Sequence, residues 1–282
     1  MTKDGTMASQ ESKINRGIWL KNGSAFDVKT AIDLGIAAEG AGWDGVFVSD
    51  SFNPYDLYSD PWSVLAAIAA RTENLTLGTW LTSVPAQQPW RLARSAATLD
   101  QLSNGRLLLG VGLGTPDDYK TYEGEYKPKK LGRKYDEALE IITQLWTGEE
   151  VSFSGEFFTV DGGKLSVLPV QEPRIPIVMG CWWPHKKPFR RAAKWDGIMP
   201  AWPAMYPGVV GPQGEKATDT YEGELRELVD YYRGLTENEP REIILPSGHE
   251  NLRLDLFREL GATWLIDMEI EDLKDVQRGP LN

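Results

Sequence analysis

Eight short apolar runs alternate with helical segments along this 282-residue chain, and this alternation constrains the fold more than any other feature. Each run is short enough for one buried strand, and turn-forming residues separate the runs from the helical segments. The expected strands are Gly17–Lys21, Val46–Ser49, Leu75–Leu81, Arg106–Val111, Ile175–Met179, Gly197–Met199, Glu242–Leu245 and Thr263–Asp267. Eight strand–helix units over about 250 residues are typical of a (β/α)8 TIM barrel. A doubly wound sheet needs fewer strands and would leave a tail unexplained.

The segments between the runs predict the rest of the architecture. Helices are expected at Phe26–Gly40, Pro61–Arg71, Gln88–Leu102, Leu131–Trp146, Phe189–Lys194, Asp219–Gly234 and Leu252–Leu260. A small hairpin is expected near 151–160, where the pattern alternates and turns at Ser154–Gly155, and a long loop near 200–218. Residues 1–16 are polar and predict a mobile tail, which leaves 17–282 as a single barrel domain.

Composition and net charge indicate which classes of molecule the protein is expected to bind. A net charge of −11 disfavours nucleic acid or an anionic membrane surface, and no apolar run approaches the length of a membrane span. Cys181 is the only cysteine, so an internal disulfide is impossible and a reducing cytoplasm is the expected compartment. We therefore expect a cytoplasmic protein that acts on a small molecule.

The loops after the strands are where a barrel carries its functional residues. These loops hold both histidines of the chain, His185 and His249, and a set of aromatic side chains: Phe52, Tyr55, Trp182, Trp183, Trp202 and Tyr206. An aromatic-lined mouth with few charges suits a broad, flat, largely apolar ligand.

Glycines end the run that begins at Arg106. Gly112 and Gly114 leave backbone without side chains at the carboxyl end of a strand, where a flat or phosphorylated group can approach closely. The pattern Gly110-x-Gly-x-Gly114 lacks the last glycine of a dinucleotide-binding fingerprint and opens a loop instead of a helix. A Rossmann nucleotide site is therefore disfavoured.

Four segments, in this order, resemble the luciferase-like monooxygenases, which use FMN or the deazaflavin F420. They are Glu39–Asp50, Leu99–Gly112, Tyr135–Gly148 with Gly155–Phe158, and Arg190–Gly197. The resemblance covers Gly17 to about Asp267. It implies a barrel with the cofactor ring across the strand carboxyl ends, often in a homodimer. The implied activity is that of an oxidoreductase that transfers hydride to or from a small organic substrate, or oxygenates it.

The resemblance also implies residues for the cofactor. Members often have a non-prolyl cis peptide after the third strand, which aligns here with Trp80–Leu81, although Trp80 could simply pack inside the barrel. The phosphate of relatives lies in the loop that starts here at Gly180 and Cys181, where His185, Lys186 and Lys187 follow. A solvated charge run and a buried thiol are the alternatives. The remaining expected cofactor contacts are Asp50, Gly112, Gly114, Thr115, Trp182 and Trp183.

The sequence also departs from the family in ways that bear on activity. F420-using sugar-phosphate dehydrogenases read Asp-His-Phe-x-Pro-Trp after the second strand, and here Ser51 and Tyr55 replace the histidine and the tryptophan. Thr115 stands in place of their glutamate, so we do not transfer their activity. Leu113 stands where luciferases place an arginine for the FMN phosphate, which favours F420.

Candidate catalytic groups are therefore Asp50, Ser51, Tyr55 and His249. Two alternatives remain open: Asp50 could be a capping carboxylate in the loop after its strand, and His249 could have no functional role. The cluster Lys127, Lys129, Lys130, Arg133 and Lys134 either steers the anionic tail of F420 or is a solvated helix start.

Two other functions remain. A barrel aldolase or isomerase would need a Schiff-base lysine inside a strand or a metal-binding set, and the sequence predicts neither. A cofactor-binding barrel without catalysis is consistent with the missing acid/base residues.

Overall fold

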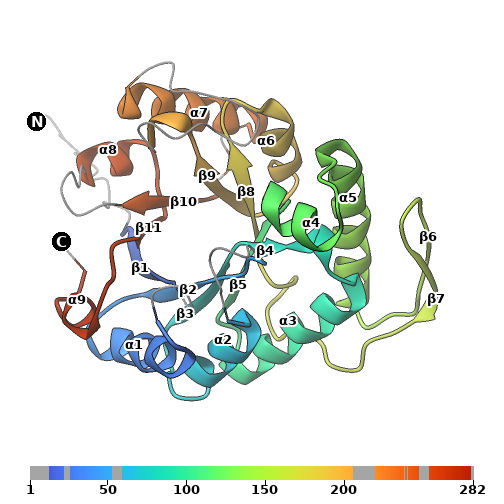
Figure 1. Ribbon diagram of the computed structural model, residues 1–282, viewed down its shortest axis with the longest axis horizontal. Helices are drawn as coiled ribbons and strands as arrows, with labels where there is room; N and C mark the ends of the chain where they lie inside the picture. The colour runs from blue at the N-terminus through green and yellow to red at the C-terminus, as the bar shows by residue number, and fades with distance from the viewer. Residues whose placement is uncertain are drawn as a thin grey trace, which may run out of the picture.

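The computed structural model describes residues 13–21, 26–52, 59–205, 220–237, 239, 241–247 and 254–280. Within them, parallel strands form a closed barrel surrounded by helices (Figure 1). The barrel strands are β1 (Asn15–Leu20), β2 (Gly45–Ser49), β3 (Thr76–Trp80), β5 (Leu107–Gly112), β8 (Ile177–Trp182), β9 (Gly197–Ala201), β10 (Glu242–Ser247) and β11 (Trp264–Asp267). Pairing of β3 with β5, through Leu77–Leu107 and Gly78–Leu108, closes the ring. The predicted TIM barrel is confirmed.

Helices follow the strands as the alternation predicts, with two helices that were not predicted, one after β5 and one after β11. The helices are α1 (Val28–Gly40), α2 (Pro61–Ala69), α3 (Pro89–Ser103), α4 (Pro116–Tyr122), α5 (Pro128–Leu145), α6 (Lys186–Ala192), α7 (Tyr221–Leu235), α8 (Leu254–Glu259) and α9 (Leu273–Gln277). Short 3-10 turns occupy η1 (Val84–Ala86) and η2 (Pro203–Met205). Local chemistry sets the helix ends. Asp27 caps α1 by accepting from the Thr30 amide, and α3 ends at Asn104 in the left-handed conformation.

The barrel interior is a packed core of large side chains. Its buried members come from alternate positions of the strands: Phe47, Leu108, Val178, Met199, Ile244, Trp264 and Ile266. Glycines on neighbouring strands make room for the rings, since a β-carbon on Gly78 would lie 2.3 Å from Phe47 Cδ1. The opposite faces of the strands pack on the helices in a second, larger apolar layer. Because these side chains fill the interior of the barrel, a ligand of the barrel must bind at one of its ends.

Several boundaries differ from the sequence-based expectation. β1 begins at Asn15, inside the stretch predicted as a tail, because Asn15–Ile18 pair with β11. β8 continues three residues past Met179 and pairs with β9 up to Trp182–Ala201. Pairing with Met199 and Pro200 of β9 thus places Gly180 and Cys181 in a strand, where the sequence predicted a loop.

Two segments outside the barrel ring complete the fold. The expected hairpin is formed by β6 (Val151–Ser154) and β7 (Thr159–Gly163), which pair antiparallel and lie outside the helix ring (Figure 1). Residues 206–218 of the predicted long loop lie outside the described residues. Among the helices that the structure describes, none has the length and apolar character needed to cross a membrane.

Candidate functional site

The carboxyl-end mouth of the barrel has a partly exposed apolar floor. Trp19, Trp80, Leu81 and Met268 pack on the inner core without being fully buried, and Trp182 is also partly exposed, on the same face of β8 as Val178. The Trp19 indole Nε1 donates to Ser49 Oγ at 2.7 Å, which fixes one edge of this floor. Sequence analysis missed Trp19 and Met268, although the two-residue alternation Gly17, Trp19 indicates an inward side chain.

The peptide bond Trp80–Leu81 is cis, as the resemblance implies. After this bond the strand resumes as β4 (Thr82–Ser83), which pairs with Val111 and Gly112 of β5. Leu81 lies against two predicted glycines: a β-carbon on Gly180 would be 2.3 Å from Leu81 Cδ1, and one on Gly112 would be 3.3 Å from Leu81 Cβ. The structure therefore brings Trp80, Leu81, Gly112 and Gly180 together at the mouth. Gly180 thus lies in β8 against the Leu81 side chain, whereas the resemblance implied that it begins a phosphate-binding loop.

Asp50 supplies an ionisable group beside this floor. It follows β2 and is 6% exposed. Burial raises the pKa of its carboxyl to about 6, and the charges of Asp60 and Asp118 act in the same direction. The side chains of Thr82 and Gln87 oppose the shift, and Gln87 Nε2 lies 3.5 Å from Asp50 Oδ2. Asp50 therefore exchanges its proton close to neutral pH.

Asp118 joins the segment after β2 to the segment after β5. Its Oδ1 accepts from Ser51 Oγ at 2.8 Å and from the Phe52 amide at 2.9 Å, and its Oδ2 accepts from the Thr115 amide at 2.6 Å. The Thr115 hydroxyl in turn accepts from the Asp118 amide at 3.4 Å, so the two residues form a capping box at the start of α4. Ser51 and Thr115, two predicted site residues, are thus both hydrogen-bonded to Asp118.

No helix was expected at 116–122, and Asp118 was not among the expected site residues. The structure buries Asp118 at the third position of α4. The signal was present in Thr115-Pro-Asp-Asp118, a capping-box sequence with proline at the first helical position.

Gly114 and Tyr119 complete this polar side of the mouth. Gly114 has φ +84°, and a β-carbon there would lie 2.3 Å from Ser83 Oγ, so glycine is required. The Tyr119 hydroxyl donates to the Leu113 carbonyl at 2.7 Å and lies 3.0 Å from Ser83 Oγ. Burial raises the pKa of Tyr119 far above its ordinary value, so this phenol stays neutral.

Three predicted residues point away from the mouth. Cys181 alternates with Gly180 and Trp182, so its thiol is buried on the helix side of β8, and this burial raises its pKa. Trp183 packs with Phe189 at 5.6 Å between ring centroids and is 2% exposed. Trp202 is fully buried, with its ring 5.1 Å from that of Tyr221. These side chains belong to the layer between strands and helices, where a cofactor ring cannot reach them.

The expected anion cradle after β8 also differs. Lys186 Nζ lies 3.3 Å from the centroid of the Trp183 ring and 4.2 Å from that of Tyr231, a cation–π arrangement. The Lys186 ammonium therefore lies over the rings of Trp183 and Tyr231. The candidates Tyr55, Tyr206 and His249 lie outside the described residues.

Comparisons with known proteins agree with this geometry. Residues 6–202 match the family described as luciferase-like monooxygenase. The F420-dependent glucose-6-phosphate dehydrogenase of Nocardia farcinica is 35% identical over an alignment of 167 residues that covers 56% of this chain and 49% of that protein. The chain thus spans about half the length of the curated relatives it matches.

Solved structures share the fold at low sequence identity. An F420-dependent secondary alcohol dehydrogenase, in complex with an F420–acetone adduct, has a TM-score of 0.67 and 21% identity; the match covers 94% of this chain and 80% of that one. The oxygenating constituent of 3,6-diketocamphane monooxygenase from Pseudomonas putida, in complex with FMN, has a TM-score of 0.65 and 18% identity, with 84% and 67% covered. The family match spans well over half of the chain and includes the strands that build the floor and the cis bond. This chain belongs to the luciferase-like monooxygenase family.

Proposed function

We propose that this protein is a deazaflavin- or flavin-dependent oxidoreductase that acts on a small organic substrate, with F420 favoured over FMN. The observation that carries the proposal is the partly exposed floor of Trp19, Trp80, Leu81 and Trp182, which borders an ionisable carboxyl, Asp50. A flavin or deazaflavin ring is apolar on its faces and polar at its edges. The floor and the polar side at Asp50 fit both properties.

Trp80, Leu81 and Trp182 would lie against the face of the ring, and the backbone at Gly112 and Gly114 would border it. When bound, F420 supplies or accepts a hydride, and reduced FMN activates oxygen. The chain itself contributes the shape of the floor, the exclusion of water by the tryptophans, and a proton exchanged at an Asp50 carboxyl oxygen. Tyr55 and His249 stay candidate acid/base groups on sequence grounds alone.

The preference for F420 rests on two observations. Leu113 occupies the position where luciferases have a phosphate-binding arginine, and its carbonyl is used by the Tyr119 hydroxyl. The curated relatives are described as F420-dependent.

We do not propose glucose 6-phosphate as the substrate. Ser51 donates to Asp118, and Thr115 accepts from the Asp118 amide as a helix cap. Neither is therefore a replacement for the histidine or the glutamate of the sugar-phosphate dehydrogenases. Because these two acid/base residues are missing, a second hypothesis also remains: a barrel that binds the cofactor without catalysing a reaction.

Titration with F420 and, separately, with FMN tests the proposal. Binding is measured by quenching of cofactor fluorescence, and we expect saturation with F420 at lower concentration than with FMN. Turnover of reduced F420 or NAD(P)H with a panel of small carbonyl compounds and alcohols then separates an enzyme from a binder. No binding of either cofactor in large excess would reject the proposal.

We also propose that the protein is a cytoplasmic homodimer. The support for the dimer is an apolar groove of about 280 Å3 between α2 and α3, lined in part by Trp62, Ala66, Leu99 and Leu102, the last 48% exposed. Light scattering should give twice the 31.5 kDa chain mass, and Leu102→Glu should lower it to one chain. A monomeric wild type would reject the dimer.

A further inference from the structure

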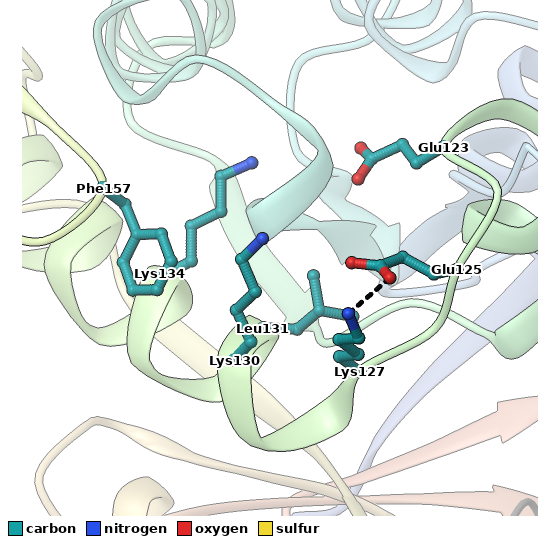
Figure 2. A pocket seen from close by; sticks show the side chains of 7 residues that line it. All are labelled: Glu123, Glu125, Lys127, Lys130, Leu131, Lys134 and Phe157. Carbon is teal, nitrogen blue, oxygen red and sulfur yellow. Dashed lines mark ion pairs between the residues drawn. The ribbon is translucent and has the colours of Figure 1, made fainter.

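A pocket of about 230 Å3 opens between the end of α4 and the first turns of α5 (Figure 2). Its lining is mostly charged and comes from the α4–α5 connection, the first turns of α5 and the hairpin: Glu123, Glu125, Lys127, Lys130, Leu131, Lys134 and Phe157. Three lysines in one pocket are unusual in a chain whose net charge is −11. We call this site the lysine pocket.

Two of the three lysines point their ammonium groups into the pocket without forming a salt bridge. Lys127 forms an ion pair with Glu125 at 2.5 Å, the only ion pair among the side chains drawn in Figure 2. In the part of the chain that the structure describes, neither Lys130 nor Lys134 forms an ion pair. Their ammonium groups point into the space between Phe157 and Glu123 (Figure 2). Lys130 also interacts electrostatically with Glu125 and Glu156, and it helps to lower the pKa of both carboxyls. Three lysines and two glutamates line the pocket, so its lining carries a net charge of +1.

The protein environment favours an anion there. Lys134 is half-buried, and its Nζ lies 5.8 Å from the centroid of the Phe158 ring, which fixes the side chain on the hairpin side. The pocket lies at the amino end of the 18-residue helix α5, where the helix dipole adds positive potential. The cap residue Lys127 provides no side-chain acceptor for the first-turn amides.

The lysine pocket is connected to the mouth by contacting side chains. Tyr126, between Glu125 and Lys127 in the chain, has its ring 5.9 Å from that of Tyr119. Tyr119 in turn lies beside Ser83 and holds the Leu113 carbonyl at the rim. Tyr126 and Tyr119 therefore link the edge of the lysine pocket to the rim of the mouth.

We propose that the lysine pocket binds the anionic tail of F420, and so makes the protein prefer F420 over FMN. This inference rests on the proposed function, because it assumes that the ring lies at the mouth. A tail with several anionic groups can contact Lys130 and Lys134 together, and each exposed contact contributes modestly. Removing both charges should weaken F420 binding about tenfold and reduce its sensitivity to salt.

The experiment compares three proteins with two deazaflavins. The proteins are wild type, the double variant Lys130→Gln/Lys134→Gln, and the control Lys129→Gln, which removes a neighbouring charge that does not line the pocket. The ligands are F420 and its tail-less chromophore, measured by fluorescence titration at low and moderate salt. We expect the double variant to lose about tenfold in F420 affinity and none for the chromophore, with the control like wild type.

The outcomes separate this inference from the proposed function. Wild type that binds neither deazaflavin rejects the proposed function and the inference together. Wild type that binds both equally well, or a double variant that binds F420 normally, rejects the lysine pocket alone. Competition by inorganic phosphate without any difference between the two deazaflavins would assign the pocket to a phosphate-bearing substrate and overturn the inference.

Discussion

Replacing Asp50 by asparagine should change how stability depends on pH. Folding raises the pKa of this carboxyl from 3.8 to about 6, mainly because the group is buried. Between these values the unfolded chain has already lost the proton that the folded protein keeps, so stability falls as pH rises. Above pH 6 the cost levels off at about 3 kcal/mol, of which about 1.4 kcal/mol develops between pH 5 and 7.5.

The Asp50→Asn variant carries no such charge. Its free energy of unfolding, relative to that of wild type, should therefore rise by about 1.4 kcal/mol from pH 5 to pH 7.5. Urea unfolding of both proteins at pH 5 and pH 7.5 measures the difference, and taking the difference cancels the other carboxylates. Asp117→Asn is the matched control, because Asp117 is exposed in the first turn of α4 and should follow wild type at both pH values. A difference between the Asp50→Asn variant and wild type that stays constant with pH would refute the reasoning.

Four further substitutions test the fold and the mouth. Gly110→Ala would place a β-carbon 2.0 Å from the Thr79 carbonyl oxygen, and it should lower the free energy of unfolding in urea by about 3 kcal/mol. Gly234→Ala, which adds a β-carbon in open space on α7, should raise it by about 0.8 kcal/mol. Equal stabilities of the two variants would contradict the close contact at Gly110. Arg106→Lys should lose about 3 kcal/mol, because the guanidinium donates to four backbone carbonyls that one ammonium cannot reach together; an unchanged melting temperature would count against this. Asp118→Asn should lower stability by about 2 kcal/mol and weaken F420 binding several-fold by releasing the segment after β2; unchanged binding would separate that segment from the site.

The barrel could be predicted from the sequence because its signal is repeated. Each apolar run is short and bounded by turn residues, and a wrong boundary at one strand does not change the count. The errors lie at strand ends, where pairing with neighbours decides the length. Trp182 and Ala201 extend β8 and β9 in this way, although the apolar pattern had stopped at Met179 and Met199.

The site was predicted less completely, because proximity along the chain does not fix where a side chain points. Trp182 and Trp183 are adjacent, yet one faces the mouth and the other packs on Phe189. The role of Asp118 depends on contacts with residues 66 and 67 positions away, which no local pattern shows. The cis bond at Trp80–Leu81 came from the family resemblance, since propensity alone does not indicate such a bond.

The most direct measurement of the central claim is the electron density of crystals grown with F420. We expect the deazaflavin ring across the strand carboxyl ends, against Trp80 and Leu81 and beside Asp50. A ring bound elsewhere on the protein, with the mouth filled only by solvent, would contradict this claim.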